Sequence, residues 1–299
     1  QGFDYYFGPL GANDGGGVAF HENNERAGNT RDMGSLTRLY TDKAIDFLEK
    51  KRDKKKPFVL YVAHTMMHTI IGASEKFRGK SKGGLYGDVV EEFDFETGRL
   101  LDVLDKQGLR DNTLVIYTSD NGPWNQGKYT KKKKGHQNDS IFWGESGPLR
   151  NGKGSPYEAG YRLPCIVRWP GKIPDGTTSD EFLTSLEIFP MLCAATGALP
   201  PKGVKLDGFD MLPVLQGKKK SSRQEMFWQR RLDKGARVGH WKWVESNRGN
   251  GLFDLRTDLS EKHDLSEAKP EILKMLKARF ANWKKQMNAA EPRGPFRDY

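Results

Sequence analysis

The chain alternates between amphipathic segments and short apolar runs. Between Ser35, which can cap a helix, and the basic run 52–56, apolar side chains recur at helical spacing, and Pro57 then stops the helix. A second such segment spans roughly 86–107 and ends at Gly108. The runs 58–63 and 113–118 are typical of strands buried on both faces of a parallel sheet. Strand, helix and strand in this order predict the α/β class.

The types of element that the pattern predicts change along the chain, and this change predicts the domain organisation. The run 165–169 predicts another strand, and a helix is expected over 180–196. Beyond Gly217, short β-type runs precede a final amphipathic helix over 270–287. We therefore expect a large α/β part over 1–216 and a small α+β subdomain with antiparallel strands over 217–299. Residues 1–35, rich in Gly and Asn without a sustained period, predict an irregular surface segment. The β-type runs of the subdomain are 225–229, 240–244 and 251–255.

Composition narrows the class of protein. The chain has 299 residues, of which 36% are hydrophobic, so a sizeable core is expected and wholesale disorder is excluded. Forty-nine basic against 39 acidic residues give a net charge of +10, which indicates attraction to polyanions. The two cysteines, Cys165 and Cys193, stand in apolar contexts and are expected to be buried, without a disulfide framework or zinc pattern. We expect no membrane span, and no targeting segment is visible after Gln1.

Polar side chains follow the two apolar runs. His64 and His68 come after the first, and Asp120, Asn121 and Gly122 after the second. Ligands of open α/β sheets bind beyond the carboxyl ends of strands, and carboxylate and amide oxygens suit Ca²⁺ or Mg²⁺. Each motif also has a plainer interpretation. Asp-Asn-Gly is an ordinary turn signal, and a histidine pair is often only hydrogen bonded or exposed to solvent.

A third motif imitates a phosphate-binding loop. Gly147 and Gly152-Lys153 fit the spacing GxxxxGK, but Gly154 stands where the Ser or Thr that holds Mg²⁺ is required. No apolar strand precedes Gly147, so nucleotide binding is disfavoured. Lys153 remains a candidate for binding a small anion.

Taken together and in this order, these motifs resemble the formylglycine-dependent sulfatases of the arylsulfatase type, within the alkaline-phosphatase-like superfamily. The resemblance covers nearly the whole chain, and no single motif decides it. The matching segments are Gln1–Gly8, Lys56–Tyr61 with His64 and His68, Tyr117–Gly122, Gly147–Arg150 with Gly152–Gly154, Tyr157–Pro164, and Leu252–Leu255 with Asp258, Glu261, Asp264 and Leu265. The resemblance implies an alkaline-phosphatase-like fold: a mostly parallel sheet flanked by helices, incomplete at the N-terminus, with a small C-terminal subdomain.

The resemblance also implies a site. Asp120 and Asn121 would supply two ligands to a divalent metal ion, most often Ca²⁺ in this family, with Mg²⁺ as the other option. His68 and Lys153 would be catalytic residues that bind the sulfate ester oxygens, and His64 would be a weaker substrate-binding candidate. The family departs from this chain at Met67 and Ile70, where it commonly has proline.

The nucleophile implied is a formylglycine made from a C/S-x-P/A-x-R motif. Neither cysteine stands in that pattern, so we expect the formylglycine, the paired acidic metal ligands and the family's Gly-Lys-x-His segment upstream of Gln1. This chain alone is then expected to be catalytically silent and to bind Ca²⁺ weakly, since Ca²⁺ takes six to eight oxygens.

The function expected is a sulfuric ester hydrolase, a sulfatase acting on a sulfated small molecule or polysaccharide. Two alternatives stay open: a non-catalytic polyanion-binding module, and a phosphoesterase or phosphonate hydrolase of the same superfamily. The polyanion module would use Lys131–Lys134, Lys218–Lys220 and the aromatic residues Trp124, Tyr129 and Trp143. Family habit implies a periplasmic or secreted protein, no nucleic-acid partner is expected, and the oligomeric state is open.

Overall fold

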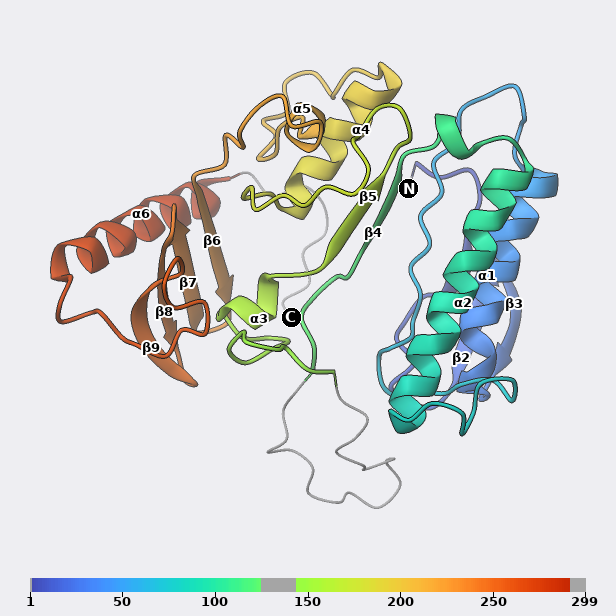
Figure 1. Ribbon diagram of the computed structural model, residues 1–299, viewed down its shortest axis with the longest axis horizontal. Coiled ribbons are helices and arrows are strands. Elements are labelled where there is room, and N and C mark those ends of the chain that lie inside the picture. Colours follow the sequence, from blue (N-terminus) through green and yellow to red (C-terminus); the bar gives the residue numbers. More distant parts are fainter. Residues whose placement is uncertain (1, 125–143, 291–299) are drawn as a thin grey trace. The chain divides into compact units, whose positions relative to one another are not determined.

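The computed structural model describes residues 2–124 and 144–290, and it divides into two units that are presented separately (Figure 1). Among the described residues, the first unit consists of 2–114 with Gly144, and the second of 115–124 with 145–290. Both contain helices and sheets, as the α/β prediction requires. No helix among the described residues combines the length and apolarity that crossing a membrane requires.

The first unit opens with an antiparallel sheet in the order β1-β2-β3, so the predicted irregular segment 1–35 is wrong. The sequence carried little sign of this sheet because many of its residues are polar. All but one residue of β3 are exposed, whereas Val18 and Phe20 of β2 are buried. The unit's core joins the sheet to the helices α1 and α2 through Phe20, Leu36 and Val89. The strands are β1 (Phe7–Pro9), β2 (Val18–Glu22) and β3 (Glu25–Thr30), and the helices are α1 (Leu36–Asp46) and α2 (Gly84–Lys106).

The first helix differs from the prediction at both ends. Ser35 itself has helical backbone angles and makes no side-chain cap, while Asp32 caps the preceding 3-10 turn η1 (Met33–Ser35) by accepting from the Gly34 N–H at 3.0 Å. After Asp46 the helix widens into a π-helical turn, η2 (Phe47–Lys51). The second helix matches its prediction closely, and Gly108 beyond it has a φ of +66°, the left-handed conformation favoured there. The 3-10 turn η3 (Arg110–Asn112) follows.

The predicted strand 58–63 is wrong. The segment does not form a strand in the structure, and Val59 and Tyr61 are exposed. An extended run becomes a strand only when another backbone completes its hydrogen-bond ladder. No described residue does so here, and the apolar pattern could not reveal this.

In the second unit, β4 (Val115–Thr118) pairs with β5 (Cys165–Arg168) in an antiparallel ribbon. The two strands were predicted, but as parallel, buried ones. All strand pairs among the described residues are antiparallel. Since the ribbon has only two strands, much of it stays open, and Cys165 is exposed against expectation while Cys193 is buried as expected.

A capping box at Thr184 places the start of the next helix later in the chain than predicted. Thr184 accepts from the Leu186 N–H, and Glu187 accepts from the Thr184 N–H at 2.6 Å, which fixes a 3-10 turn η6 (Ser185–Glu187) ahead of α4 (Ile188–Thr196). The predicted start at Asp180 is therefore wrong. Two short helices, α3 (Glu158–Tyr161) and α5 (Leu212–Leu215), complete this part of the unit.

The chain after residue 217 forms a four-stranded antiparallel sheet in the order β6-β7-β8-β9, covered on one face by α6 (Pro270–Ala289) (Figure 1). Trp243, Leu252 and Phe280 pack in the core between sheet and helix, as the predicted amphipathic face requires. The strand β7 was missed because its sequence, DKGARV, is largely polar. We retain 217–299 as a proposed subdomain. Its strands are β6 (Glu225–Arg230), β7 (Asp233–Val238), β8 (Trp241–Ser246) and β9 (Gly249–Asp254).

Candidate functional site

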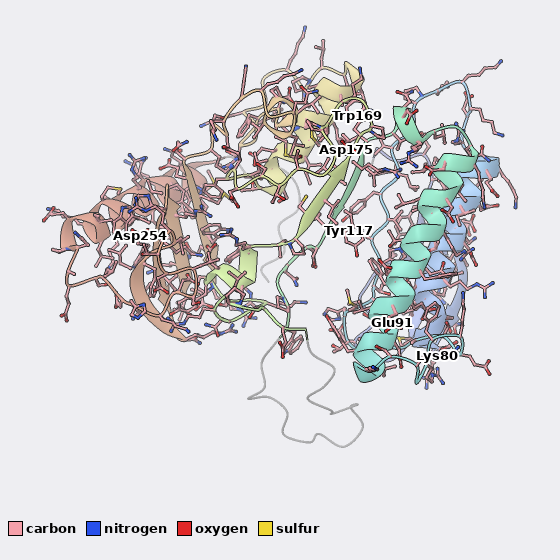
Figure 2. All side chains as sticks on the ribbon, in the orientation of Figure 1. Lys80, Glu91, Tyr117, Trp169, Asp175 and Asp254 are labelled. Atoms are coloured by element: carbon pink, nitrogen blue, oxygen red, sulfur yellow. The ribbon has the colours of Figure 1, made fainter. Side chains whose placement is uncertain are left out.

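The predicted metal ligands lie directly after β4, on which Tyr117 is labelled in Figure 2. Asp120 is exposed, and Asn121 is half-buried and donates its Nδ2 to the Gly122 carbonyl at 3.0 Å. The Ser119 hydroxyl donates to the Asn121 carbonyl at 3.1 Å. These bonds shape the turn. The carboxylate oxygens of Asp120 and the amide oxygen of Asn121 are the kind of ligand that a hard cation prefers.

The lysine loop is joined to this turn within the second unit. The Lys153 N–H donates to the Pro123 carbonyl at 2.8 Å, and the Gly122 N–H donates to the Gly160 carbonyl at 3.3 Å. The structure therefore brings Lys153 beside the segment that carries Asp120 and Asn121, although about thirty positions separate them in sequence. Three of the four principal predicted site residues belong to one compact arrangement.

Gly122 is required by this contact. A Cβ built on it would lie 1.6 Å from the Ala159 carbonyl oxygen, which is part of α3. We expect Gly122→Ala to destabilise the second unit by roughly 1–3 kcal/mol, because the backbone of α3 has to move away. Thermal unfolding of the variant checks this. As a contrast, Gly98→Ala in α2, where the new Cβ meets nothing within 4 Å, should stabilise the first unit by about 0.5–1 kcal/mol. A Gly122→Ala protein as stable as the wild type would contradict the packing.

His68 lies in the first unit, on the loop that precedes Ile71 of the core. Its Nδ1 donates to the Thr69 carbonyl at 2.8 Å and lies 3.7 Å from Asp14 Oδ1. The buried Asn13 donates Nδ2 to the carbonyls of His68 and Ile70, both at 3.1 Å. Nε2 is therefore the ring nitrogen of His68 left for a ligand. Asn13 is a positioning residue for this loop, and no sequence pattern had indicated it.

His64 is placed among aromatic side chains of the first unit. Its ring centroid lies 4.9 Å from that of Phe93 and 6.0 Å from that of Tyr40, and its Nδ1 is buried without a hydrogen-bond partner among the described residues. Burial lowers the pKa of His64 to about 4, from an ordinary value of 6.5. The ring is thus neutral at pH 7.

This burial predicts acid lability of the first unit. Between pH 6.5 and 4 the unfolded chain binds a proton at His64 that the folded chain does not, so the stability of the fold falls as the pH drops. The loss is at most ~3 kcal/mol, since one pKa unit is worth about 1.4 kcal/mol. Urea unfolding at pH 7 and pH 4.5 should show this loss in the wild type and a smaller one in His64→Phe. His263→Phe, in the other unit, is the control. An equal loss in wild type and His64→Phe would rule the assignment out.

One motif was missed. Ser146-Gly147-Pro148-Leu149-Arg150 satisfies the bare S-x-P-x-R pattern, whereas the sequence analysis weighed only the cysteines. In the structure the Ser146 hydroxyl donates to the Leu149 carbonyl at 2.8 Å, and Arg150 donates Nη1 to the Glu261 carbonyl at 2.5 Å. The Arg150 guanidinium also lies 4.1 Å from the Tyr157 ring. These contacts make the motif part of the lysine loop.

The described residues contain no group of three or more His, Cys, Asp or Glu that could hold a metal ion. Asp120 and Asn121 fit a hard cation in donor type but supply only two of the six to eight oxygens that Ca²⁺ takes. The pair is therefore part of a metal site, and further ligands have to complete it.

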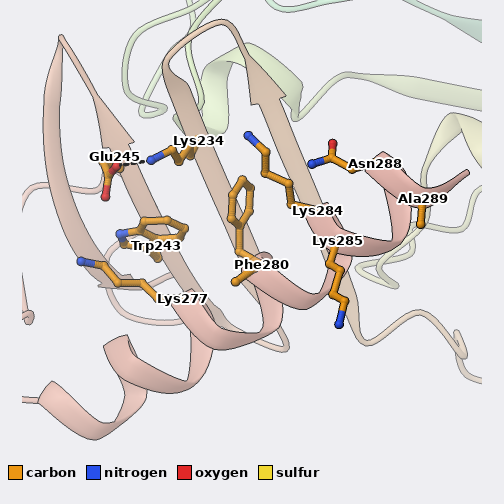
Figure 3. A pocket seen from close by; sticks show the side chains of 10 residues that line it. Lys234, Trp243, Glu245, Lys277, Phe280, Lys284, Lys285, Asn288 and Ala289 are labelled. Atoms are coloured by element: carbon orange, nitrogen blue, oxygen red, sulfur yellow. Dashed lines mark hydrogen bonds and ion pairs between the residues drawn. The ribbon is translucent and has the colours of Figure 1, made fainter.

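Two surface grooves lie away from these residues. One, of about 720 Å³, runs between α6 and strands β7 and β8 (Figure 3), and another, of about 710 Å³, is lined by residues of the first unit such as Arg38 and Arg78. Neither is lined by His64, His68, Asp120, Asn121 or Lys153. The candidate site is therefore identified by chemistry and not by the size of a groove. The first groove is lined by Lys234, Trp243, Glu245, Lys277, Phe280, Ala281, Lys284, Lys285, Asn288 and Ala289.

Comparison with known proteins decides the family. The profile described as Sulfatase matches residues 1–198, and that described as N-sulphoglucosamine sulphohydrolase, C-terminal, matches residues 152–286. The chain belongs to the sulfatase family. It is 36% identical to the steryl-sulfatase of Mus musculus over 197 residues, which cover 66% of this chain and 30% of that protein. It is 32% identical to the N-acetylgalactosamine-6-O-sulfatase of Bacteroides thetaiotaomicron over 259 residues, covering 80% of this chain and 49% of that protein.

Solved structures confirm the alkaline-phosphatase-like fold of this sulfatase chain. A structure concerned with the metabolism of multiple glycosaminoglycans by Bacteroides thetaiotaomicron matches with a TM-score of 0.80 at 25% identity, covering 95% of this chain and 73% of that one. A complex with a neocarrahexaose matches with a TM-score of 0.73 at 28% identity, covering 89% and 58%. The chain spans 30% of the length of the first of these curated relatives and 49% of the length of the second.

Proposed function

We propose that this chain is part of an enzyme that hydrolyses sulfate esters, in which Asp120, Asn121 and Lys153 of the second unit form part of a site for a cation and a sulfate group. We propose His68 of the first unit as a further sulfate-binding residue. The observation that carries the proposal is the hydrogen bond from the Lys153 N–H to the Pro123 carbonyl. It sets a cationic side chain beside a turn of oxygen ligands, which is the charge arrangement that an oxyanion and its metal ion need.

The proposed roles follow from the chemistry of each side chain. Asp120 and Asn121 would hold a divalent cation, Ca²⁺ or Mg²⁺, through their oxygens. Lys153 would place a positive charge, and His68 a ring nitrogen, against the sulfate oxygens on which negative charge grows in the transition state. The ring of His64, neutral at pH 7, would contribute a hydrogen bond and not a charge. A hydrated formylglycine, if the protein carries one, would supply the attack on sulfur.

The test begins with the nucleophile. The coding sequence read in frame upstream of Gln1 should contain a C/S-x-P/A-x-R motif, and the protein that includes it should release sulfate from an aryl sulfate in a metal-dependent way. The 299-residue chain alone should release none. A longer protein that cleaves phosphate esters and not sulfate esters would favour the phosphoesterase alternative.

Peptide mass spectrometry tests whether Ser146, which begins an S-x-P-x-R pattern within this chain, is itself converted to formylglycine. The peptide that contains Ser146 should carry unmodified serine. A peptide lighter by two hydrogen atoms would instead place the formylglycine at Ser146 and contradict the assignment of this segment to the lysine loop.

The substrate class is proposed as a sulfated carbohydrate. Two relatives of this chain are named N-acetylgalactosamine-6-O-sulfatase and steryl-sulfatase, and one similar structure is a complex with a neocarrahexaose. The net charge of +10 favours a polysaccharide with many sulfate groups over a sterol sulfate, which carries a single negative charge. The habit of the sulfatase family favours export, so we also propose a periplasmic or secreted location.

A second candidate function, polyanion binding, is favoured by the groove along α6 (Figure 3). Lys234 in it is paired with Glu245 at 2.5 Å, whereas Lys277, Lys284 and Lys285 form no ion pair with the described residues. The run Lys131–Lys134, with Tyr129 and Trp143, lies outside the described residues. Trp124 and Lys218–Lys220 are exposed, and Lys220 pairs with Glu181 at 2.9 Å.

The groove predicts where a sulfated polymer binds. Replacing Lys277, Lys284 and Lys285 with alanine should lower the salt concentration that elutes the protein from heparin, because fewer counterions are released on binding. Replacing Lys172, Lys202 and Lys205, which are exposed and do not line the groove, removes the same charge and serves as the control. Equal elution of the two triple variants would show that net charge alone, and not the groove, sets the affinity.

A further inference from the structure

A lysine stands on the buried face of the C-terminal sheet. Side chains of β8 alternate: Trp243 packs in the core with α6, while Lys242 and Val244 point to the opposite face. Lys242 has no exposed surface, although its neighbours Val244 and Phe253 are apolar. A charge in this position needs partners, because an unpaired buried ammonium group is strongly disfavoured.

The partners come from two distant segments. Lys242 Nζ lies 2.8 Å from Glu158 Oε1 and 3.7 Å from Glu261 Oε1, and the Glu158 N–H donates to Glu261 Oε2 at 2.7 Å. The exposed fractions of the three residues are 0%, 3% and 0% for Lys242, Glu158 and Glu261. We refer to Lys242, Glu158 and Glu261 as the buried charge triad. It joins the sheet, the first residue of α3 and the segment that follows β9.

The two carboxylates differ in their charge. Burial would raise the pKa of Glu158, but the Lys242 ammonium, with Arg237 and Arg162 nearby, outweighs burial and lowers it. Burial dominates at Glu261 and raises its pKa to about 7, against the opposing effect of Lys242. Glu158 is therefore the ionised partner of Lys242, and Glu261 serves chiefly as the acceptor for the Glu158 N–H.

The triad leads directly to the candidate site. Glu158 begins α3, and the next two residues, Ala159 and Gly160, are those that Gly122 contacts. Arg150, which donates to the Glu261 carbonyl at 2.5 Å, accepts from the Ala159 N–H at 3.2 Å and lies three residues before Lys153. Each end of the loop that carries Lys153 is therefore held by the triad or by a residue bound to it.

We propose that Lys242 and Glu261 are positioning residues: by fixing Glu158 they hold α3 and the lysine loop against the turn of Asp120 and Asn121. The subdomain after residue 217 thereby sets the geometry of a site whose ligands precede it. The effect on catalysis rests on the proposed function, whereas the holding of α3 and the lysine loop by the triad does not. Buried ion pairs are often no more stabilising than apolar residues of the same size, so a role in fixing one geometry accounts for the triad better than stability does.

Hydrogen exchange followed by mass spectrometry tests this on the 299-residue chain without any substrate. Lys242→Met removes the ammonium and keeps a long apolar side chain. We expect at least tenfold faster exchange in segments 147–163 and 119–124, with less than threefold change in β6, β7 and α6. The matched control is Lys234→Met, which removes an ion-paired lysine from the neighbouring strand β7 and should leave both segments unchanged.

A residue that only stabilised the fold would change the sheet that contains it at least as much as segment 119–124, which it does not touch. Uniform acceleration across the second unit, or no acceleration in segment 119–124, would overturn the proposal. If Lys242→Met fails to fold, Glu261→Gln gives the same local pattern on a smaller scale, since its amide oxygen still accepts from Glu158. In the active enzyme, Lys242→Met should lower kcat per folded molecule with little change in KM. The expected acceleration in Lys242→Met, together with no sulfate release by the longer wild-type protein, would overturn the proposed function and leave the positioning intact.

Discussion

Replacing Asp120 with alanine in the longer protein that we propose to be a sulfatase is expected to lower kcat/KM by at least about a thousandfold, or ~4 kcal/mol of transition-state stabilisation. Asp120 is the only residue of the proposed site that offers the cation a formal negative charge from this chain, and it is exposed after β4 without a competing hydrogen bond from the described residues. Losing it removes both an oxygen ligand and the attraction that holds the ion.

Two variants make this result specific. Asp120→Asn keeps an oxygen but not the charge, so its activity should lie between those of wild type and Asp120→Ala and recover partly at high metal concentration. Asp175→Ala removes an exposed carboxylate elsewhere in the same unit and should leave kcat/KM unchanged. Full activity of Asp120→Ala at limiting metal would show that the cation is held by other residues.

Replacing Lys153 with alanine is expected to lower kcat by roughly a hundredfold to a thousandfold, the range observed when one group that stabilises an oxyanion is removed. The loop keeps its place, because the bond to Pro123 is made by the Lys153 backbone and not by its side chain. The variant should therefore remain folded, with a normal thermal transition, which separates loss of the ammonium group from loss of structure.

Lys153→Arg keeps the charge but not the shape and should recover part of the lost kcat. Lys172→Ala, which removes an exposed lysine from the same unit, controls for net charge. Wild-type kcat in Lys153→Ala would remove this residue from the proposed sulfate site.

The sequence predicted well those elements whose stability comes from one long amphipathic face. The helices α2 and α6 lie where apolar spacing put them, because their buried stripes are set by local periodicity. It failed where a partner decides the structure. The strand β3 is almost wholly exposed and is held by its ladder with β2, whereas the apolar run 58–63 has no pairing strand in the part of the chain that the structure describes.

For the site, residue types were predictable but their arrangement was not. Asp-Asn-Gly after an apolar run indicated a cation turn, and a lysine between glycines indicated an anion. That Lys153 is bound to Pro123 follows from Gly122 packing on Ala159, a contact between segments far apart in the chain. Lys242 gave no signal at all, since a lysine on a strand is ordinarily exposed, and its burial depends on Glu158, 84 positions away.

The most direct test is a crystal structure of the enzyme grown with Ca²⁺ and sulfate, with the ion located by its anomalous signal. It should show oxygens of Asp120 and Asn121 at about 2.3–2.6 Å from the cation. Lys153 Nζ should lie within about 3 Å of an oxygen of a sulfate ion beside it, and a ring nitrogen of His68 should contact a sulfate oxygen. A cation held elsewhere, or a sulfate ion bound without Lys153, would contradict the account.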